Sequence, residues 1–399
     1  MILKICSFLV ISLIIKQMTF KNNSKKVKTM ITTQFDHNTD VIHLNHARLS
    51  PWPLCTREAV KHFSQNMRYA TPQQSNEEQQ LRAQLAHLLA APSADHIALL
   101  KNTSEALSII ATGLIWQTGD NIVLPKQEFP SNRIIWQSLE KQGVECVFVD
   151  LKQQDDPEQA LMDACDANTR LLTVSAVQFS DGLRLDLARL GRFCQQQKSL
   201  LFCVDAAQQL GAYPIDVTAM QIDFLVACGH KWLCGPEGMG ILYVCPSWLN
   251  RLQLHHYGWH MLETIDFEQQ TWQTAKTARR FECGGSNTLN IQILHSSLNM
   301  FENIGFNNIS QALTERIDFL FSQLQTAGFE IATPTLSKQR AGIISFRVPD
   351  QDSADLYQRF NQQGFICSQR GDNIRFSPHF YITEDQLNCV VARIKHLLS

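Results

Sequence analysis

The sequence predicts an α/β fold, with a large domain built on a mostly parallel β-sheet and a smaller α+β domain at the C-terminus. Three observations support this fold class. From about residue 36, helical patterns alternate with short apolar runs, the order expected of a parallel sheet. These runs hold few polar residues, as strands do when helices cover both sheet faces. Beyond about residue 290, longer helices and isolated strands follow.

The large domain is predicted from seven apolar runs and the helical stretches between them. In chain order, the strands are HIALLKN at 96–102, NIVLP at 121–125, VECVFVD at 144–150, RLLTVSAVQF at 170–179, LLFCVDA at 200–206, DFLVACG at 223–229 and GILYVC at 240–245. The helices are Glu77–Leu89, Ser104–Leu114, Arg133–Gln142, Pro157–Asp166 and Leu187–Gln197.

The C-terminal domain is predicted to begin with a long helix, Ile291–Ala327, broken near Gly305. A strand GIISFRV at 342–348, a helix Ser353–Gln363, a strand IRFS at 374–377 and a last helix Glu384–Leu398 follow. We therefore predict an N-terminal extension at 1–30, an N-terminal arm at 31–50, a large domain at 51–290 and a small domain at 291–399.

The composition narrows the class of protein. Of the 399 residues, 44% are apolar and 18% are charged, an ordinary balance for a soluble enzyme. A formal net charge of -2 gives no electrostatic reason to expect nucleic acid or an anionic membrane as partner. Twelve cysteines are scattered without a CxxC pair. We therefore expect no metal site and interpret most cysteines as buried residues in a reducing, cytoplasmic compartment.

The N-terminus is the one unusual region. Ile5–Ile15 is an uninterrupted apolar run, too short to span a bilayer comfortably. It is similar to the apolar part of a signal peptide, but the polar, basic stretch Lys21–Lys28 follows in place of an A-x-A cleavage site. Three interpretations stay open: a true start at Met18 or Met30, an export signal or membrane anchor, or a simple appendage. The thiol content argues against export.

The strongest candidates for chemistry are Asp205 and Lys231. Asp205 ends the apolar strand LLFCV, and Lys231 follows the strand DFLVAC after a Gly-His step. The carboxyl ends of strands line the ligand crevice of an open α/β sheet, so we expect both side chains in one cleft. A partly desolvated lysine can condense with a carbonyl cofactor, and an aspartate can hold a pyridine nitrogen protonated. The structural alternative is an ion pair at a strand end.

Other candidates lie near the same strand ends. Thr103 and Ser104 stand between a strand and a helix, where backbone N–H groups and hydroxyls suit a phosphate; a plain N-cap is the alternative. His230 can donate a further hydrogen bond to that phosphate. Phe129 can stack on a flat cofactor, with core packing as its alternative. Gln208 can offer its amide to a phenolic oxygen.

These motifs together resemble the class V aminotransferase family of fold-type I enzymes, which depend on pyridoxal 5'-phosphate (PLP). The resemblance rests on VDAAQQLGAYPIDV…IDFLVACGHKWLCGPEGMGILYV and on NHARLSPWP, LLKNTSEAL, QEFPSN, SAVQFSDGLRLDL and IRFSPHFYIT. The motifs keep the family's order from about Val41 to the C-terminus. The family includes cysteine desulfurases, selenocysteine lyases, kynureninases, isopenicillin N epimerase and some transaminases.

The resemblance assigns the cofactor contacts. It implies that Lys231 holds PLP as a Schiff base, that Asp205 faces the pyridine nitrogen and that Gln208 contacts the phenolic oxygen. Phe129 is similar to the family's stacking ring. The residues similar to its phosphate ligands are Thr103, Ser104 and His230.

The resemblance also implies the substrate contacts and a homodimer. Arg375 matches the arginine that binds the substrate α-carboxylate, with a salt bridge as the structural alternative, and Arg370 is a weaker candidate for the same cleft. Asn45 lies where the family's N-terminal arm approaches the substrate. In the family, a Gly-Thr-x-Asn-like turn reaches the phosphate of the second subunit. Here Ser286 is the candidate for its hydroxyl, which can also be missing at Gly285.

The resemblance leaves the reaction open. Many cysteine desulfurases have a reactive cysteine between the positions of Arg370 and Arg375, where this chain reads Gly-Asp-Asn-Ile. Cys367 precedes that loop in a strand-like run. We therefore expect an enzyme that acts on a small amino acid through Lys231, as a transaminase or a C–S, C–Se or C–C lyase, without a persulfide-forming loop cysteine. The alternatives are an amino-acid epimerase and a PLP-fold binding protein without catalysis.

Overall fold

The structure is a computed structural model that describes residues 32–398 apart from 39, 69–75, 198, 267 and 269. The predictions for residues 1–30 therefore lie outside the described residues. No helix among the described residues is long and apolar enough to cross a lipid bilayer.

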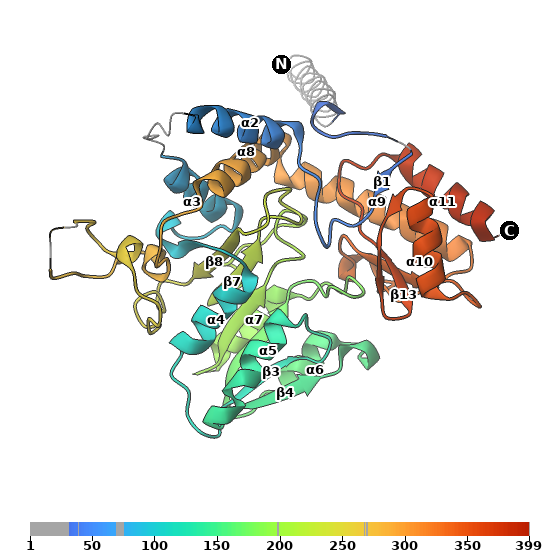
Figure 1. Cartoon of the computed structure of the whole chain (residues 1–399). Coiled ribbons are helices and arrows are strands. Elements are labelled where there is room, and N and C mark those ends of the chain that lie inside the picture. Colours follow the sequence, from blue (N-terminus) through green and yellow to red (C-terminus); the bar gives the residue numbers. More distant parts are fainter. Residues whose placement is uncertain are drawn as a thin grey trace, which may run out of the picture.

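A seven-stranded sheet forms the centre of the larger part of the molecule (Figure 1). Its strand order is β2-β8-β7-β6-β5-β3-β4. All neighbours from β7 to β4 are parallel, and β8 is antiparallel to both of its neighbours. The strands are β2 (Ile97–Leu100), β3 (Asn121–Pro125), β4 (Glu145–Val149), β5 (Thr169–Ser175), β6 (Leu201–Asp205), β7 (Phe224–Cys228) and β8 (Gly240–Val244). The predicted fold class is confirmed.

The two edge strands of the sheet, β2 and β4, differ in burial. Every residue of β2 is buried, as in β3, β6, β7 and β8, whereas every residue of β4 is exposed or half-buried. The helices of this part are α2 (Leu54–Met67), α3 (Glu77–Leu88), α4 (Thr103–Gly113), α5 (Ser131–Gln137), α6 (Pro157–Asp163) and α7 (Leu187–Gln196). Sequence analysis missed α2, which buries only Thr56 and so carries a weak apolar pattern.

Several predicted strands are shorter in the structure, the run 170–179 among them. The run 170–179 forms a strand only as far as Ser175. Beyond it, the N–H of Gln178 donates to the carbonyl of Leu183, and the chain reverses through Gly182 at φ +78°. A positive φ of this kind suits glycine, which has no Cβ to clash. The apolar residues of this segment therefore line a hairpin beside the sheet.

The C-terminal part is built on a four-stranded antiparallel sheet of order β12-β13-β10-β9. The predicted break in the long helix is confirmed at Gly305, which has φ +88°. The elements are α8 (Thr288–Ile304), α9 (Phe306–Thr326), β9 (Glu330–Ile331), β10 (Ile344–Arg347), α10 (Ser353–Gln362), β11 (Phe365–Ile366), β12 (Ser368–Arg370), β13 (Asn373–Phe376) and α11 (Glu384–Leu398).

Two apolar cores lie side by side, and α8 contributes to both. Leu294 and Leu298 belong to the core around the seven-stranded sheet, whereas Phe301 and Ile304 belong to the core under the C-terminal sheet. The N-terminal arm joins the second core, because β1 (Ile42–His43) pairs in parallel with β11. The domain boundary near residue 290 stays a prediction, and these contacts favour a division nearer Gly305.

Candidate active site

A cavity of about 390 Å³ opens at the carboxyl ends of β6 and β7. It lies where an open α/β sheet is expected to bind a ligand. The structure therefore brings together most of the residues singled out in the sequence. Those that line the cavity are Thr103, Ser104, Phe129, Asp205, Gln208, His230, Lys231, Arg370 and Arg375.

Lys231 is held by a compact turn after β7. The N–H of Gly235 donates to the carbonyl of Gly229 at 2.8 Å, and the N–H of Cys234 donates to the carbonyl of Lys231 at 3.0 Å. These backbone bonds fix the start of the lysine side chain. Its Nζ lies 5.7 Å from the centre of the Phe129 ring. The amine therefore shares the cavity with an aromatic face.

Asp205 lies at the end of β6 and is 5% exposed. Burial raises the pKa of its carboxyl, while the N–H of Ala207 at 2.9 Å and the charge of Lys231 act in the opposite direction. A buried carboxylate beside an amine is suited to a cationic partner that enters the cavity. The strand-end positions of Asp205 and Lys231 thus place both groups in one cleft, as predicted.

The start of α4 supplies the polar side of the cavity. The side-chain oxygen of Asn102 caps the helix by accepting the N–H of Glu105 at 2.9 Å. Ser104 Oγ lies 2.7 Å from Oγ of Ser131, the first residue of α5. The start of α4 and the two hydroxyls therefore lie at the same space, which suits an anion. Sequence analysis missed Ser131, because only the fold brings the two helices together.

His230 faces this polar side in its neutral form. Burial, with a smaller effect of Lys231, lowers the pKa of its imidazole to about 4. Its buried Nδ1 has no hydrogen-bond partner among the described residues. An unpaired buried nitrogen is costly unless a ligand satisfies it. This orphaned atom therefore favours a hydrogen-bonding ligand in the cavity.

Phe129 and Gln208 line the cavity by different means. Phe129 is 41% exposed, and Phe179 meets it edge to face at 5.3 Å. Gln208 already donates from Nε2 to the carbonyl of Ala47 at 2.8 Å, and its Oε1 accepts the indole N–H of Trp232 at 2.9 Å. Because an amide nitrogen carries two protons, one proton of Gln208 remains for a ligand.

Arg375 is a buried guanidinium without an acidic partner in the described part of the chain. It is 1% exposed and donates to Ser368 Oγ at 3.1 Å, to the carbonyl of Phe179 at 2.7 Å and, weakly, to Asn45 Oδ1 at 3.5 Å. Burial lowers its pKa to about 9, and the charges of Arg370 and Arg48 add to that effect. A carboxylate from a ligand would satisfy this charge.

Arg370 and Arg48 make the same end of the cavity more positive. Burial, followed by the charge of Arg48, lowers the pKa of Arg370. Neither arginine forms an ion pair with a carboxylate of the described residues. Arg48 belongs to the N-terminal arm and was not predicted, although Asn45, three residues before it, was expected to approach the substrate.

Ser286 lies outside this cavity. Its Oγ donates to Glu78 Oε2 at 2.8 Å and lies 3.4 Å from Nε2 of His260. Glu78, His260 and Glu282 have oxygen and nitrogen atoms within 4.8 Å of one another, but Arg82 forms ion pairs with both glutamates. The role of Ser286 toward a second subunit stays a prediction.

Glu128 is a buried acid under the cavity that sequence analysis missed. It accepts from the N–H of Ser175 at 2.6 Å, from Ser175 Oγ at 2.5 Å and from Gln178 Nε2 at 3.0 Å. Burial raises its pKa to about 7, and the charge of Asp205 adds to that effect. Only the tertiary structure reveals this acid, because the short motif QEFPSN does not show that its glutamate points inward.

Replacement of Glu128 by glutamine is expected to change how stability depends on pH. The folded-state pKa of about 7 exceeds the ordinary value of 4.5, so the folded chain binds more protons than the unfolded chain between these values. Ionisation of Glu128 therefore costs stability as pH rises through this range, by on the order of 3 kcal/mol. Thermal unfolding measured at pH 5 and at pH 8 should show that Glu128→Gln loses less stability between these two pH values than the wild type does. Equal losses of stability in the two proteins would contradict the raised pKa of Glu128. Glu140→Gln, at the surface, serves as the control variant.

Comparisons with known proteins place the chain in a family. The sequence profile described as Aminotransferase class-V matches residues 56–387. A protein of Methanothermobacter thermautotrophicus named probable cysteine desulfurase is 27% identical over 388 residues, which cover 90% of this chain and 95% of that protein. A cysteine desulfurase of Escherichia coli is 29% identical over 287 residues, or 69% of this chain and 68% of its own.

Solved structures share the fold. The apo structure of a cysteine desulfurase from Thermococcus onnurineus NA1 has a TM-score of 0.82 at 22% identity and covers 90% of this chain and 94% of its own. The cystine C–S lyase C-DES, in complex with its reaction product cysteine persulfide, has a TM-score of 0.82 at 24% identity, with 88% and 96% covered.

The cavity has the chemistry that PLP requires. Its polar side can receive a phosphate at the start of α4, at the hydroxyls of Ser104 and Ser131 and at the orphaned Nδ1 of His230. The carboxyl of Asp205 suits a pyridine nitrogen, and Lys231 supplies the amine for an aldehyde carbon. Together with the profile match over most of the sequence, this fit shows that the chain belongs to the aminotransferase class-V family of PLP-dependent enzymes.

Proposed function

We propose that this enzyme is a lyase that removes a sulfur- or selenium-bearing group from a small amino acid without storing it on a cysteine of its own. The observation that carries the proposal is the turn between β12 and β13. Gly371 and Asp372 form this turn, with φ +56° at Gly371. Glycine and aspartate cannot take up sulfur, so the displaced group would leave as a small molecule.

The nearest cysteines support this interpretation. Cys367, just before β12, is 2% exposed, and burial raises the pKa of its thiol to about 12. Cys228 lines the cavity at the end of β7 but is itself buried, and burial raises the pKa of its thiol too. A cysteine attacks as its thiolate, so both residues are poorly suited to accept sulfur at neutral pH.

The residues around the cavity divide the work of such a reaction. Bound PLP withdraws electrons from the substrate α-carbon. We propose that Arg375 binds the substrate carboxylate, with Asn45 holding the guanidinium in place. Asp205 would keep a proton at the pyridine nitrogen, and the start of α4 with the hydroxyls of Ser104 and Ser131 would hold the phosphate. The amine of Lys231 would take the proton from the α-carbon.

The balance of the reaction can be written for cysteine. The α-proton passes to Lys231, the Cβ–S bond breaks, and its electron pair leaves with the sulfur as sulfide. Addition of water to the remaining three-carbon fragment gives pyruvate and ammonia. With cystine, the leaving group is cysteine persulfide, the product named for the C-DES structure.

A substrate screen tests the proposal. The holoenzyme is incubated with cysteine, cystine, selenocysteine, kynurenine and alanine, and the products are identified. Sulfide or persulfide with pyruvate and ammonia supports the lyase. Alanine with sulfide would indicate desulfuration, a keto acid with the amine form of the cofactor would indicate transamination, and an inverted α-carbon would indicate an epimerase. Each of these three outcomes contradicts the proposal.

Replacement of Cys367 by alanine is expected to leave sulfur release within about twofold of the wild type, because a buried thiol with a raised pKa is a poor nucleophile. The measurement is the initial rate of sulfide formation from cysteine, with Cys389→Ala on α11 as matched control. A loss of two orders of magnitude in Cys367→Ala, with the cofactor absorption intact, would mean that this thiol carries the sulfur.

We propose that two copies of the chain associate near Ser286 and that the enzyme works in the cytoplasm. The aromatic side chains of Tyr257, Trp259 and Trp272 in that region are 61%, 47% and 56% exposed, and exposed apolar patches often mark interfaces. Molar mass by light scattering tests the dimer. Fractionation of cells that express the full chain tests the compartment.

A further inference from the structure

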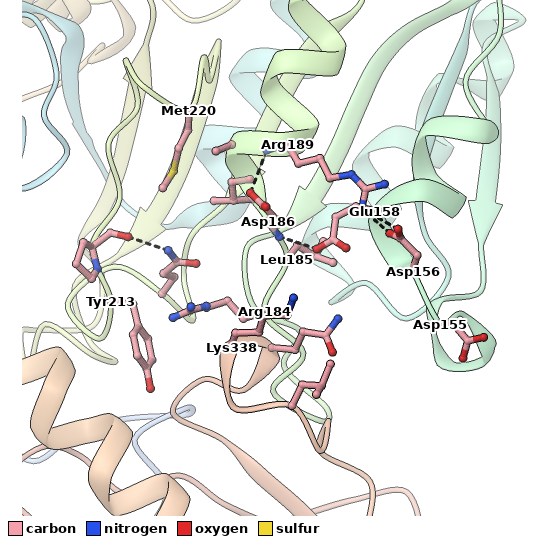
Figure 2. Close-up of a pocket in the computed structure, with 16 residues that line it drawn as sticks. Asp155, Asp156, Glu158, Arg184, Leu185, Asp186, Arg189, Tyr213, Met220 and Lys338 are labelled. Carbon is pink, nitrogen blue, oxygen red and sulfur yellow. Dashed lines mark hydrogen bonds and ion pairs between the residues drawn. The ribbon is translucent and has the colours of Figure 1, made fainter.

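Figure 2 shows residues that line a second cavity, of about 550 Å³. The segment 184–189 and the residues around Tyr213 form one side, and the segment 336–339 after β9 forms the other. Neighbouring residues divide the two cavities. Gln208 lines the active-site cavity, and Gln209 lines the second one; Val177 lines the first, and Arg184, its bridge partner, lines the second. The two cavities therefore share a wall.

Two cations face the second cavity without an acidic partner in the described residues. The guanidinium carbon of Arg184 lies 4.9 Å from the centre of the Tyr213 ring. Arg184 belongs to segment 184–189 and Lys338 to segment 336–339, so the two cations line the cavity from its two sides. The stacked ring fixes the direction of Arg184, so its charge is presented in one orientation. Such an arrangement suits a carboxylate.

Gln209 adds an unsatisfied acceptor to the same cavity. Its side chain is 4% exposed, and Nε2 donates to the carbonyl of Pro214 at 3.0 Å. That bond leaves Oε1 buried with no partner among the described residues. A buried amide oxygen without a hydrogen bond is unfavourable, so the cavity is matched to a ligand that carries a donor.

The acidic residues of the cavity are only partly neutralised. Asp156 pairs with Arg189 at 2.7 Å, and Glu158 accepts the N–H of Asp186 at 2.6 Å. The carboxylate of Asp186 caps the N–H of Arg189 and forms no ion pair with a described basic side chain. The cavity therefore offers negative charge and an amide acceptor as well as two free cations. This combination matches a ligand with both an anion and an ammonium group.

We propose that this cavity is a second site that binds a free amino acid as its zwitterion. Arg184 and Lys338 bind the carboxylate, while Gln209 Oε1 and Asp186 accept from the ammonium group. Because the shared wall includes Gln208, and because Arg375 donates to Phe179 beside Val177, an occupied second site changes the KM for substrate. The coupling rests on the proposed function; the binding does not.

The test for binding uses holoenzyme whose active site is blocked with aminooxyacetate, a reagent for carbonyl groups. Each of the twenty protein amino acids is titrated into it by calorimetry. At least one is expected to bind with one site per chain. Arg184→Ala is expected to raise its Kd about tenfold and Lys338→Ala about threefold, whereas Arg192→Ala, on the exposed side of α7, leaves it within twofold. Because Lys338 is exposed, its replacement does not put the fold at risk.

Two results would overturn the site: no heat with any amino acid, or a Kd that neither Arg184→Ala nor Lys338→Ala changes. The coupling has its own measurement, the KM of the unblocked enzyme with and without the bound amino acid. A change of threefold or more that disappears in Lys338→Ala supports it, and an unchanged KM overturns it. An enzyme without lyase activity would refute the proposed function and leave the binding result standing.

Discussion

Replacement of Lys231 by alanine is expected to lower kcat by about a thousandfold or more. The lysine amine shares the cavity with Asp205 and lies 5.7 Å from the centre of the Phe129 ring. Its replacement removes the proposed base for the α-proton, and proton transfer by a positioned base contributes about 10²- to 10⁴-fold. The covalent attachment of the cofactor is lost as well.

The measurement combines turnover with spectroscopy. The visible absorption of cofactor linked to lysine is expected to disappear in Lys231→Ala, while circular dichroism stays unchanged. Lys126→Ala is the matched control, because Lys126 pairs with Asp150 at the surface and does not line the cavity. Retention of both the absorption and the turnover in Lys231→Ala would remove Lys231 from the mechanism.

Replacement of Arg375 by methionine is expected to raise KM about a hundredfold with a smaller change in kcat. Loss of a charge-assisted, bidentate contact to a carboxylate costs about 2–5 kcal/mol of binding. The uncharged methionine fills much of the same volume, so the effect reports the charge rather than an empty space. Arg375→Lys keeps the charge without the planar fork. Its KM is therefore expected to lie between those of the wild type and Arg375→Met.

Arg375→Met is expected to have a Tm no lower than that of the wild type. Burial lowers the pKa of Arg375 to about 9, so its positive charge is unfavourable in the folded chain at neutral pH. Removal of an unpaired buried charge relieves this cost, although the hydrogen bonds to Ser368 and Phe179 are lost. A large drop in Tm with an unchanged KM would instead make Arg375 a structural residue.

Some expectations from the sequence were confirmed because they depend on local patterns. The strand NIVLP and the helix Glu384–Leu398 have the predicted bounds in the structure. The break at Gly305 was also predictable, because glycine is the residue that adopts a positive φ without strain. Helix α2 escaped prediction, since it buries a single residue.

Other features exist only through contacts between distant segments. Ser131 meets Ser104 because α4 and α5 start at the same edge of the sheet. Arg48 joins Arg375 because the N-terminal arm, through β1, pairs with β11. The hairpin through Gly182 brings Phe179 to Arg375. From the sequence, residues 170–179 were predicted to form one continuous strand. No spacing in the chain predicts these approaches.

The sequence by itself determined the fold class, because strand and helix patterns are local signals, and its family resemblance indicated the cofactor. It also predicted that Asp205 and Lys231 share one cleft, because parallel strands present their carboxyl ends at one edge. The tertiary structure decided what surrounds those residues. It left Arg375 buried without an acid, raised the pKa of Glu128 to about 7 and placed Gln208 and Gln209 in two adjoining cavities. Burial and charge depend on segments that are far apart in the chain, so these properties arise only when the chain folds.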